Sequence, residues 1–435
     1  MKKNIVCIAA LAALMAAALP LAAQGRDRGT LPAPAPTPPH APAPTPPPAP
    51  APAPTTTAAG GFTMSGTTLI KYTGTSARVT IPNNVKSIGE RAFQSNYTIT
   101  SVTIPNGVTA IGEAAFESCI SLTAVTIPNS VTAIGWNAFN GCEKLAAVTL
   151  PNGITTIELG VFAQCTSLAG ITIPAAVTAI EDSAFRATGL TGITIPANVK
   201  SIEQNAFNGC LSLAAINVAP GNAVYSSADG VLFDRNKTTI IKVPEGKTGE
   251  YAIPRGVTAI GKEAFANTFK LTHVIIPDTW TAVGYMAFYN AGFPAVTIPS
   301  SVTTLDVSAF VGAYLTAVTI PDSVTAIGEQ AFRNCSFLVS VTIGSGVTAI
   351  EARTFYGCRG LPAITIPANV TRIGESAFED CTNLTSVTFQ GTIAAAAFSS
   401  HNAFPGDLRA KYLAGGPGTY TTNAPVHIRS VWRKQ

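Results

Sequence analysis

The sequence predicts a repeat solenoid that is rich in short β-strands and tight bends, with about 14 coils of 22–23 residues and one β-hairpin insertion. Two periodic features predict this fold. An Ala-Phe step, or a close variant, recurs every 22 or 23 residues between Phe93 and Phe378, with one gap of 58 residues. An Ile-Pro step recurs in the same phase between Ile81 and Ile366. The composition, 47% hydrophobic but only 11% charged, fits coils that share one long core.

Each repeat divides into two short extended pieces and a bend, as residues 122–142 illustrate. Residues 125–127 (Val-Thr-Ile) alternate inward, outward and inward, which is the pattern of a half-buried strand. Pro128 ends this piece because proline has no N–H for the ladder. Residues 131–134 turn inward again, and Gly135 is expected to permit a tight bend before the Ala-Phe step fills the coil. One unit cannot bury this face alone, so neighbouring units must stack.

The chain is expected to divide into six segments. The first is a signal peptide with Lys2, Lys3 and a following apolar core, although a retained N-terminal anchor helix is the alternative. The second has Pro at 13 of the 24 positions 31–54, which predicts an extended spacer or a passive linker. The segments are 1–23, signal peptide; 24–61, Pro/Ala/Thr-rich stalk or linker; 62–218, N-terminal repeat block; 219–252, β-hairpin insertion; 253–390, C-terminal repeat block; and 391–435, C-terminal cap and tail.

Composition also excludes several classes of protein. Residues 5–23 are the only apolar run of spanning length, so no transmembrane span is expected after removal of the signal. The low charge argues against a coiled coil and against charge-driven disorder. The net charge is +4 and no basic cluster stands out, so we expect no nucleic-acid partner.

The repeats resemble the BspA-like branch of the leucine-rich repeat proteins. The Val-Thr-Ile-Pro, Val-Thr-Ala-Ile-Gly and Ala-Phe-x-x-Cys steps carry this resemblance over residues 68–390. The core of the insertion, residues 225–234, resembles the hairpin common in that family, and residues 404–416 resemble the end of such arrays in host-associated spirochaetes. The family implies an exported, surface-associated or secreted adhesin that binds host matrix proteins, host cell-surface proteins or other bacterial surfaces. A non-adhesive structural component of the envelope is the alternative, and a glycan-binding or glycan-processing protein is a third.

The cysteines recur at one repeat position. Seven of them lie three residues after the repeat Phe: Cys119, Cys142, Cys165, Cys210, Cys335, Cys358 and Cys381. Because other repeats place Asn, Thr or Ala there, this position favours a small side chain, and the cysteines are interpreted as a buried ladder. Export would permit disulfides, but seven is an odd number and the expected parallel Cβ vectors suit a bridge poorly. No Cys-x-x-Cys spacing indicates a zinc site.

No residue pattern predicts catalysis. Histidine occurs four times, and neither a Gly-x-Ser-x-Gly nor a His-Glu-x-x-His motif is present. The carboxylates are scattered over the bends instead of paired. We therefore predict a protein that is not an enzyme and that has no catalytic residues, no cofactor and no metal site.

The surface is the remaining candidate for function. The outward strand position is almost always threonine, which predicts one flat, uncharged, hydroxyl-bearing sheet for partner contact. The alternative is that threonine is present only for its strand propensity and solubility. The threonines assigned to this face are Thr103, Thr126, Thr149, Thr172, Thr194, Thr297, Thr319, Thr342 and Thr365.

The regular pattern breaks beside the insertion, where Asn217 and Ile275 replace Thr and His273 replaces a small residue. A protruding hairpin carrying Tyr225 and Phe233 would make this region a local hot spot. Repeat decay, with the hairpin aromatics packing back on the coil, is the alternative.

Three other aromatic residues stand at repeat positions that hold other residues elsewhere. Trp280 occupies an inward valine position and is expected in the core. Trp136 and Tyr285 share an outward position and are expected to be exposed.

Overall fold

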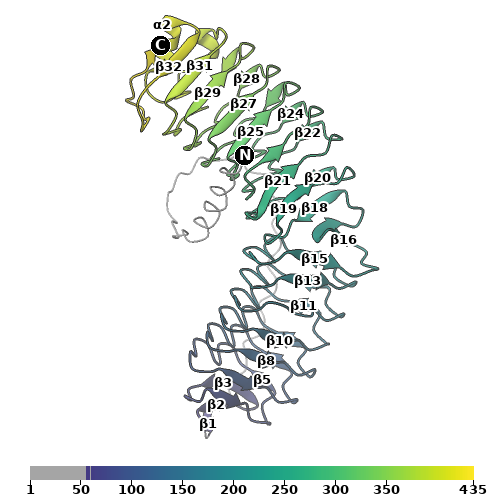
Figure 1. Ribbon diagram of the computed structural model, residues 1–435. Helices are drawn as coiled ribbons and strands as arrows, with labels where there is room; N and C mark the ends of the chain where they lie inside the picture. Colours follow the sequence, from purple (N-terminus) through teal and green to yellow (C-terminus); the bar gives the residue numbers. More distant parts are fainter. Residues whose placement is uncertain (1–54, 59) are drawn as a thin grey trace, which may run out of the picture. The chain divides into compact units, whose positions relative to one another are not determined.

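The computed structural model describes residues 55–58 and 60–435. The expected signal peptide and nearly all of the expected stalk lie outside the described residues. The described chain is a β-solenoid of about 14 turns whose coils follow one another in single file (Figure 1). Its helices are a short 3₁₀ turn, η1 (Ala395–Ala397), and one α-helix, α2 (Leu408–Gly415), both in the C-terminal cap. No helix within the described ranges is long and apolar enough to cross a membrane.

Two series of short strands run along the array. The Val-Thr-Ile pieces give the first series, and the Ala-Ile pieces give the second. The first series is β4 (Arg78–Thr80), β6 (Ser101–Thr103), β8 (Ala124–Thr126), β10 (Ala147–Thr149), β13 (Gly192–Ile195), β15 (Ala215–Val218), β19 (Gly249–Ala252), β21 (Leu271–Ile275), β23 (Val296–Thr297), β25 (Ala317–Ile320), β27 (Ser340–Ile343), β29 (Ala363–Ile366) and β31 (Ser386–Phe389). The second series is β5 (Ser87–Ile88), β7 (Ala110–Ile111), β9 (Ala133–Ile134), β11 (Thr156–Ile157), β12 (Ala179–Ile180), β14 (Ser201–Ile202), β20 (Ala259–Ile260), β22 (Ala282–Val283), β24 (Thr304–Leu305), β26 (Ala326–Ile327), β28 (Ala349–Ile350) and β30 (Arg372–Ile373).

Successive coils pair in parallel and in register, so each repeat position forms a column. Val102 pairs with Val125, and Thr103 pairs with Thr126. The first series does not form one continuous sheet as the sequence suggested, because its hydrogen-bonded ladder is broken into five short sheets. Strands of two to five residues, most of them ended by proline, leave few ladder bonds to hold neighbouring sheets together.

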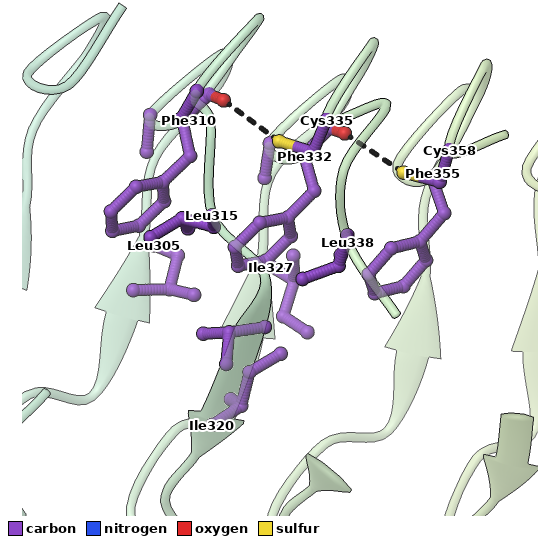
Figure 2. Packing of buried hydrophobic residues seen from close by; sticks show 14 of the residues in the cluster. Leu305, Phe310, Leu315, Ile320, Ile327, Phe332, Cys335, Leu338, Phe355 and Cys358 are labelled. Carbon is purple, nitrogen blue, oxygen red and sulfur yellow. Dashed lines mark hydrogen bonds between the residues drawn. The ribbon is translucent and has the colours of Figure 1, made fainter. Parts of the chain in front are cut away.

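A stack of phenylalanine rings runs through the core. From Phe93 to Phe207, and again from Phe288 to Phe404, consecutive rings lie 4.4–5.9 Å apart between centroids with interplanar angles of 1–15°. Figure 2 shows Phe310, Phe332 and Phe355 one behind another above the leucine and isoleucine side chains. Large apolar burial of this kind is the main favourable term for each added coil.

The bend around each phenylalanine uses left-handed backbone, but not at the glycine that the sequence singled out. Residues two before and two after the ring have positive φ, for example Asn137 at 54° and Gly141 at 71° around Phe139. Gly135 is needed for a different reason, since a Cβ there would lie 2.5 Å from the backbone N of Glu113. The expectation that Gly135 permits the bend is therefore wrong, because its missing side chain allows two coils to approach closely.

The hairpin insertion lies within the array and does not protrude from it. Strands β16 (Tyr225–Ala228), β17 (Val231–Asp234) and β18 (Thr239–Lys242) pair antiparallel, and β18 pairs in parallel with β20. Side chains of β17 alternate between two cores: Leu232 packs in the N-terminal core, and Phe233 packs in the C-terminal core. The hairpin is thus the seam that joins the two blocks.

A buried ion pair lies at this seam. Lys242 Nζ lies 2.9 Å from Glu245 Oε1, and Glu245 is 1% exposed. The same oxygen accepts hydrogen bonds from Gly209 N at 3.1 Å and from Asn267 Nδ2 at 3.3 Å. One carboxylate therefore links the last coil before the insertion to the first complete coil after it.

Antiparallel strands close both ends of the described array. At the N-terminal end, β1 (Thr55–Ala58), β2 (Phe62–Ser65) and β3 (Thr68–Tyr72) form a meander that pairs with β5. At the C-terminal end, β32 (Gly418–Thr421) pairs antiparallel with β31, and β33 (Arg433–Lys434) pairs with β32. These strands cover the edges that parallel stacking would leave open.

Candidate binding surface

The strands of the first series carry a row of exposed threonines. Thr103, Thr126 and Thr149 lie on adjacent strands in one register, with buried valine or partly buried valine before each. All nine threonines assigned to this face from the sequence are exposed. Thr172 lies in a stretch outside any strand, where the ladder is broken. The remaining outward positions of β6, β8 and β10 hold Ser101, Ala124 and Ala147, so this part of the face is small-chained and uncharged.

The threonine hydroxyls on this face differ in their hydrogen bonding from the threonines near the second series of strands. Thr109, Thr178 and Thr303, near the second series, each donate to a backbone carbonyl of the preceding coil at 3.1–3.2 Å. Within residues 55–58 and 60–435, the side chains of Thr103 and Thr126 make no such bond. The first kind of threonine ties coils together, whereas the second keeps its donor and acceptor capacity for an external partner.

The irregular region beside the insertion is a small polar cluster. His273 Nε2 lies 2.7 Å from Thr297 Oγ1, and His273 Nδ1 lies 3.5 Å from Glu250 Oε2. Ile275 is half-buried between Ala252 and Thr297 in the same sheet, and Asn217 is exposed on β15. Thr297 is thus engaged within the protein, unlike the other threonines of the row.

Two residues assigned to this hot spot are not available to a partner. Phe233 is fully buried in the C-terminal core, and Tyr225 is buried with its hydroxyl accepting a hydrogen bond from Ile202 N at 2.9 Å. The expectation that they protrude is wrong, because the hairpin replaces part of a coil and its aromatics fill the seam.

The other aromatic predictions agree with the structure. Trp280 is buried and donates its indole N–H to Val257 O at 2.7 Å. Trp136 and Tyr285 are 55% and 64% exposed. Trp136 Nε1 donates to Glu158 Oε2 at 3.1 Å, which orients the ring along the bend.

Sequence reasoning missed a strip of surface aromatics, which we define as Phe269, Tyr314 and Phe337. The Phe269 and Tyr314 centroids are 4.8 Å apart, and those of Tyr314 and Phe337 are 5.0 Å apart. Phe269 and Phe337 are exposed, and Tyr314 is half-buried. Phe269 and Tyr314 meet across an intervening coil that has Gly292 at the matching position. The signal in the sequence was the clustering of aromatics one or two residues after the cysteine position.

The seven cysteines form the expected buried ladder, and all are free thiols. Each S–H donates to the carbonyl oxygen of the phenylalanine in the preceding coil, as Figure 2 shows for Cys335 and Cys358. Burial raises the pKa of Cys119, Cys165, Cys335 and Cys381 to about 12. Such thiols stay protonated at neutral pH and are poor nucleophiles and poor metal ligands. Within the described part of the chain, no group of three His, Cys, Asp or Glu side chains could hold a metal ion.

Comparison with known proteins places the chain in a family. Residues 67–189, 178–248, 245–313 and 303–404 match the family model described as a BspA-type leucine-rich repeat region. A leucine-rich cell surface protein from Faecalibacterium prausnitzii is 31% identical over 76% of this chain and 85% of its own, with a TM-score of 0.41. A leucine-rich repeat protein from Eubacterium ventriosum is 26% identical over 75% and 78%, with a TM-score of 0.46.

A third solved structure, the pneumococcal vaccine antigen PcpA, is 22% identical over 74% of this chain and 77% of its own, with a TM-score of 0.48. No curated protein matches the chain. The family assignment rests on the repeat sequence, which the family model covers over most of the described array. The chain belongs to the BspA-type leucine-rich repeat family.

Proposed function

We propose that this protein is an exported, surface-displayed repeat protein that binds other proteins through the threonine face, and that it acts as an adhesin. The partners would be host matrix proteins, host cell-surface proteins or the surfaces of other bacteria. The observation that carries the proposal is the row of exposed threonines whose hydroxyls, apart from that of Thr297, have no hydrogen-bond partner among residues 55–58 and 60–435, in contrast to the threonines that tie the coils together. An array of this kind binds by area, since successive coils add equivalent contacts.

The chemistry of the face supports protein contact more than catalysis. Its outward strand positions in β6, β8 and β10 carry hydroxyl and methyl groups and no titratable side chain. Hydroxyl groups can donate and accept hydrogen bonds, and the small side chains let a partner backbone approach. The 31% sequence identity to a leucine-rich cell surface protein from Faecalibacterium prausnitzii supports display on a cell surface.

Binding to a panel of purified extracellular matrix proteins and to intact bacteria tests the function. We expect saturable binding to at least one member of the panel. Absence of saturable binding across the panel would contradict adhesion and would favour a structural role in the envelope. Deletion of the gene separates the same two functions, because an adhesin's loss reduces attachment, whereas a structural component's loss weakens the envelope and leaves attachment intact.

Display at the surface needs its own test. Proteinase treatment of intact cells should remove the repeat array from an exposed protein, while a periplasmic marker survives. Survival of the array under conditions that degrade a known surface protein would contradict display.

A further inference from the structure

The positive charge of the protein is concentrated in its C-terminal cap. Residues 391–435 contain five of the 27 Lys and Arg residues but only one of the 23 Asp and Glu residues. The net charge of this segment is therefore +4, which equals that of the whole chain, and residues 1–390 are neutral on balance.

Three of the five cap cations are engaged within the protein. Lys411 lies 3.8 Å from Asp407, the Arg409 guanidinium donates to Phe398 O and Ala395 O, and Lys434 Nζ donates to Gly415 O. The other two behave differently. The guanidinium groups of Arg429 and Arg433 have no hydrogen-bond or ion-pair partner among the described residues.

Arg429 and Arg433 face a common hollow. Together with the exposed His427 they line a hollow of about 500 Å³, whose lining includes no Asp or Glu. Two unneutralised guanidiniums at one hollow form a site for anionic oxygen atoms, because the planar donor fork of arginine matches phosphate and carboxylate geometry.

Large aliphatic side chains alternate with these cations. Ile428 is 74% exposed and Val431 is 60% exposed, which makes Ile428 the most exposed large apolar residue of the described chain. Their exposure is not a consequence of a loose segment. Trp432 is fully buried, its backbone N donates to Asp407 Oδ1 at 2.7 Å, and its indole N–H donates to Pro405 O at 2.9 Å. Val426 is also buried, so the loop is held on both sides while Ile428 and Val431 point to solvent.

We propose that this surface, the basic cap face, docks onto an anionic phospholipid bilayer; it is defined by His427, Ile428, Arg429, Val431 and Arg433. Ile428 and Val431 enter the boundary between head groups and acyl chains, while Arg429 and Arg433 bind lipid phosphates. A soluble polyanion would use the arginines but would leave the two aliphatic side chains in water. Only a surface that offers negative charge and hydrocarbon together matches both kinds of exposed residue, and this contact would be a peripheral attachment distinct from the threonine face.

Vesicle co-sedimentation of the full chain tests the proposal. The vesicles contain phosphatidylcholine either alone or mixed with phosphatidylglycerol. The charge variant is Arg429→Gln with Arg433→Gln, and its matched control is Lys200→Gln with Lys270→Gln, which removes two exposed charges from the array. The apolar variant is Ile428→Ser with Val431→Ser. Every variant retains residues 1–54, so any contribution of that segment is common to all.

We expect binding that requires phosphatidylglycerol and weakens with added salt. The charge variant should partition about 25-fold more weakly, about fivefold for each arginine, while the control pair stays near wild type. The apolar variant should also lose binding, with circular dichroism and thermal unfolding unchanged. Three results would overturn the proposal: no dependence on phosphatidylglycerol, an equal loss in the control pair, or an unchanged apolar variant. In the last case, retained binding to heparin or to single-stranded DNA would identify a site for soluble polyanions.

Discussion

The thiol of Cys335 donates a hydrogen bond of 3.1 Å to the carbonyl oxygen of Phe310 in the preceding coil. The same relationship recurs at all seven ladder cysteines, with S···O distances of 2.9–3.3 Å. Each of these carbonyls also accepts the backbone N–H three residues later in its own coil, as Phe310 O does from Ala313 N at 3.0 Å. The cysteine thus fills a small space and adds a second hydrogen bond that links two coils. This accounts for the repeat position better than a redox role does.

Replacement of a ladder cysteine by alanine should destabilise the array. Cys335→Ala removes one of the two donors to Phe310 O, since Ala313 N also donates to it, and leaves a small cavity. We expect a loss of about 1–3 kcal/mol in the free energy of unfolding. Cys335→Thr should cost less, since threonine fills more of the space and Thr188 and Thr268 occupy the same repeat position. Their hydroxyls donate to Phe185 O and Phe265 O of their own coil, three residues earlier, and not to the preceding coil. Urea titration of the two variants compares them. Equal loss in both would show that filling the space at this position does not limit the damage.

Alkaline pH should destabilise the protein through the same thiols. The pKa of Cys119, Cys165, Cys335 and Cys381 is raised from 9.0 to about 12 by burial. The stabilising contribution is complete below pH 9, because both folded and unfolded chains then keep the proton. Between pH 9 and pH 12 the unfolded chain releases protons that the folded chain retains, so stability falls by about 1.4 kcal/mol per pH unit for each thiol at most.

The thiol contribution can be separated from other groups that titrate in this range. The slope of unfolding free energy against pH should become shallower when Cys335 and Cys381 are both replaced by threonine. The same groups should resist a thiol reagent at pH 8 in the native protein and react in denaturant. Rapid reaction of the folded protein would contradict their burial.

Glycines at one repeat position should respond differently to the same substitution. Gly135→Ala places a Cβ 2.5 Å from Glu113 N, and we expect it to destabilise the array by about 1–3 kcal/mol. Gly284 occupies the equivalent position, yet a Cβ there has no neighbour within 4 Å. Gly284→Ala should therefore be neutral or slightly stabilising, because alanine restricts the unfolded chain. Thermal unfolding measures the stability of the two variants. Similar losses of stability would show that the contact at Gly135 does not cause the destabilisation.

Removal of one partner of the ion pair at the seam should lower the free energy of unfolding more than replacement of both partners by neutral side chains. Lys242→Met leaves the Glu245 carboxylate buried beside Gly209 N and Asn267 without its cation, and we expect a loss of about 3–5 kcal/mol. Adding Glu245→Gln should recover much of this loss, because the neutral amide still accepts the Gly209 N–H. A double-mutant cycle by urea unfolding measures the coupling. Additive losses would contradict an interaction between the two side chains.

The sequence predicted the repeat fold because the same residue pattern recurs many times along the chain. The repeat positions of Val125 and Phe139 indicate which side chains of a coil are buried. Because the coils stack in register, the same positions are buried in each coil. The role of Gly135 and the position of Phe233 could not be predicted in the same way. Both depend on contacts between coils, which a pattern within one coil does not contain.

The candidate site was predicted in part for the same reason. Exposure of Thr126 follows from alternation along a strand, but the freedom of its hydroxyl depends on where the neighbouring carbonyls lie. The stacking of Tyr314 on Phe337 and the hollow between Arg429 and Arg433 join residues in separate coils or turns. Only the three-dimensional path of the chain brings them together.

The threonine face is tested most directly by inserting charge into it. The variant carries Thr103→Lys, Thr126→Lys and Thr149→Lys, at exposed positions on adjacent strands. Its control carries Ser121→Lys, Ser167→Lys and Ser212→Lys, at a repeat position where Lys144 and Lys270 already stand. Both variants add the same charge.

The measurement is the affinity of each variant for the protein partner found in the binding panel. If the threonine face binds, the threonine variant loses affinity at least tenfold, the effect of about 1.4 kcal/mol, while the control binds like wild type. Unchanged affinity of the folded threonine variant would contradict the account.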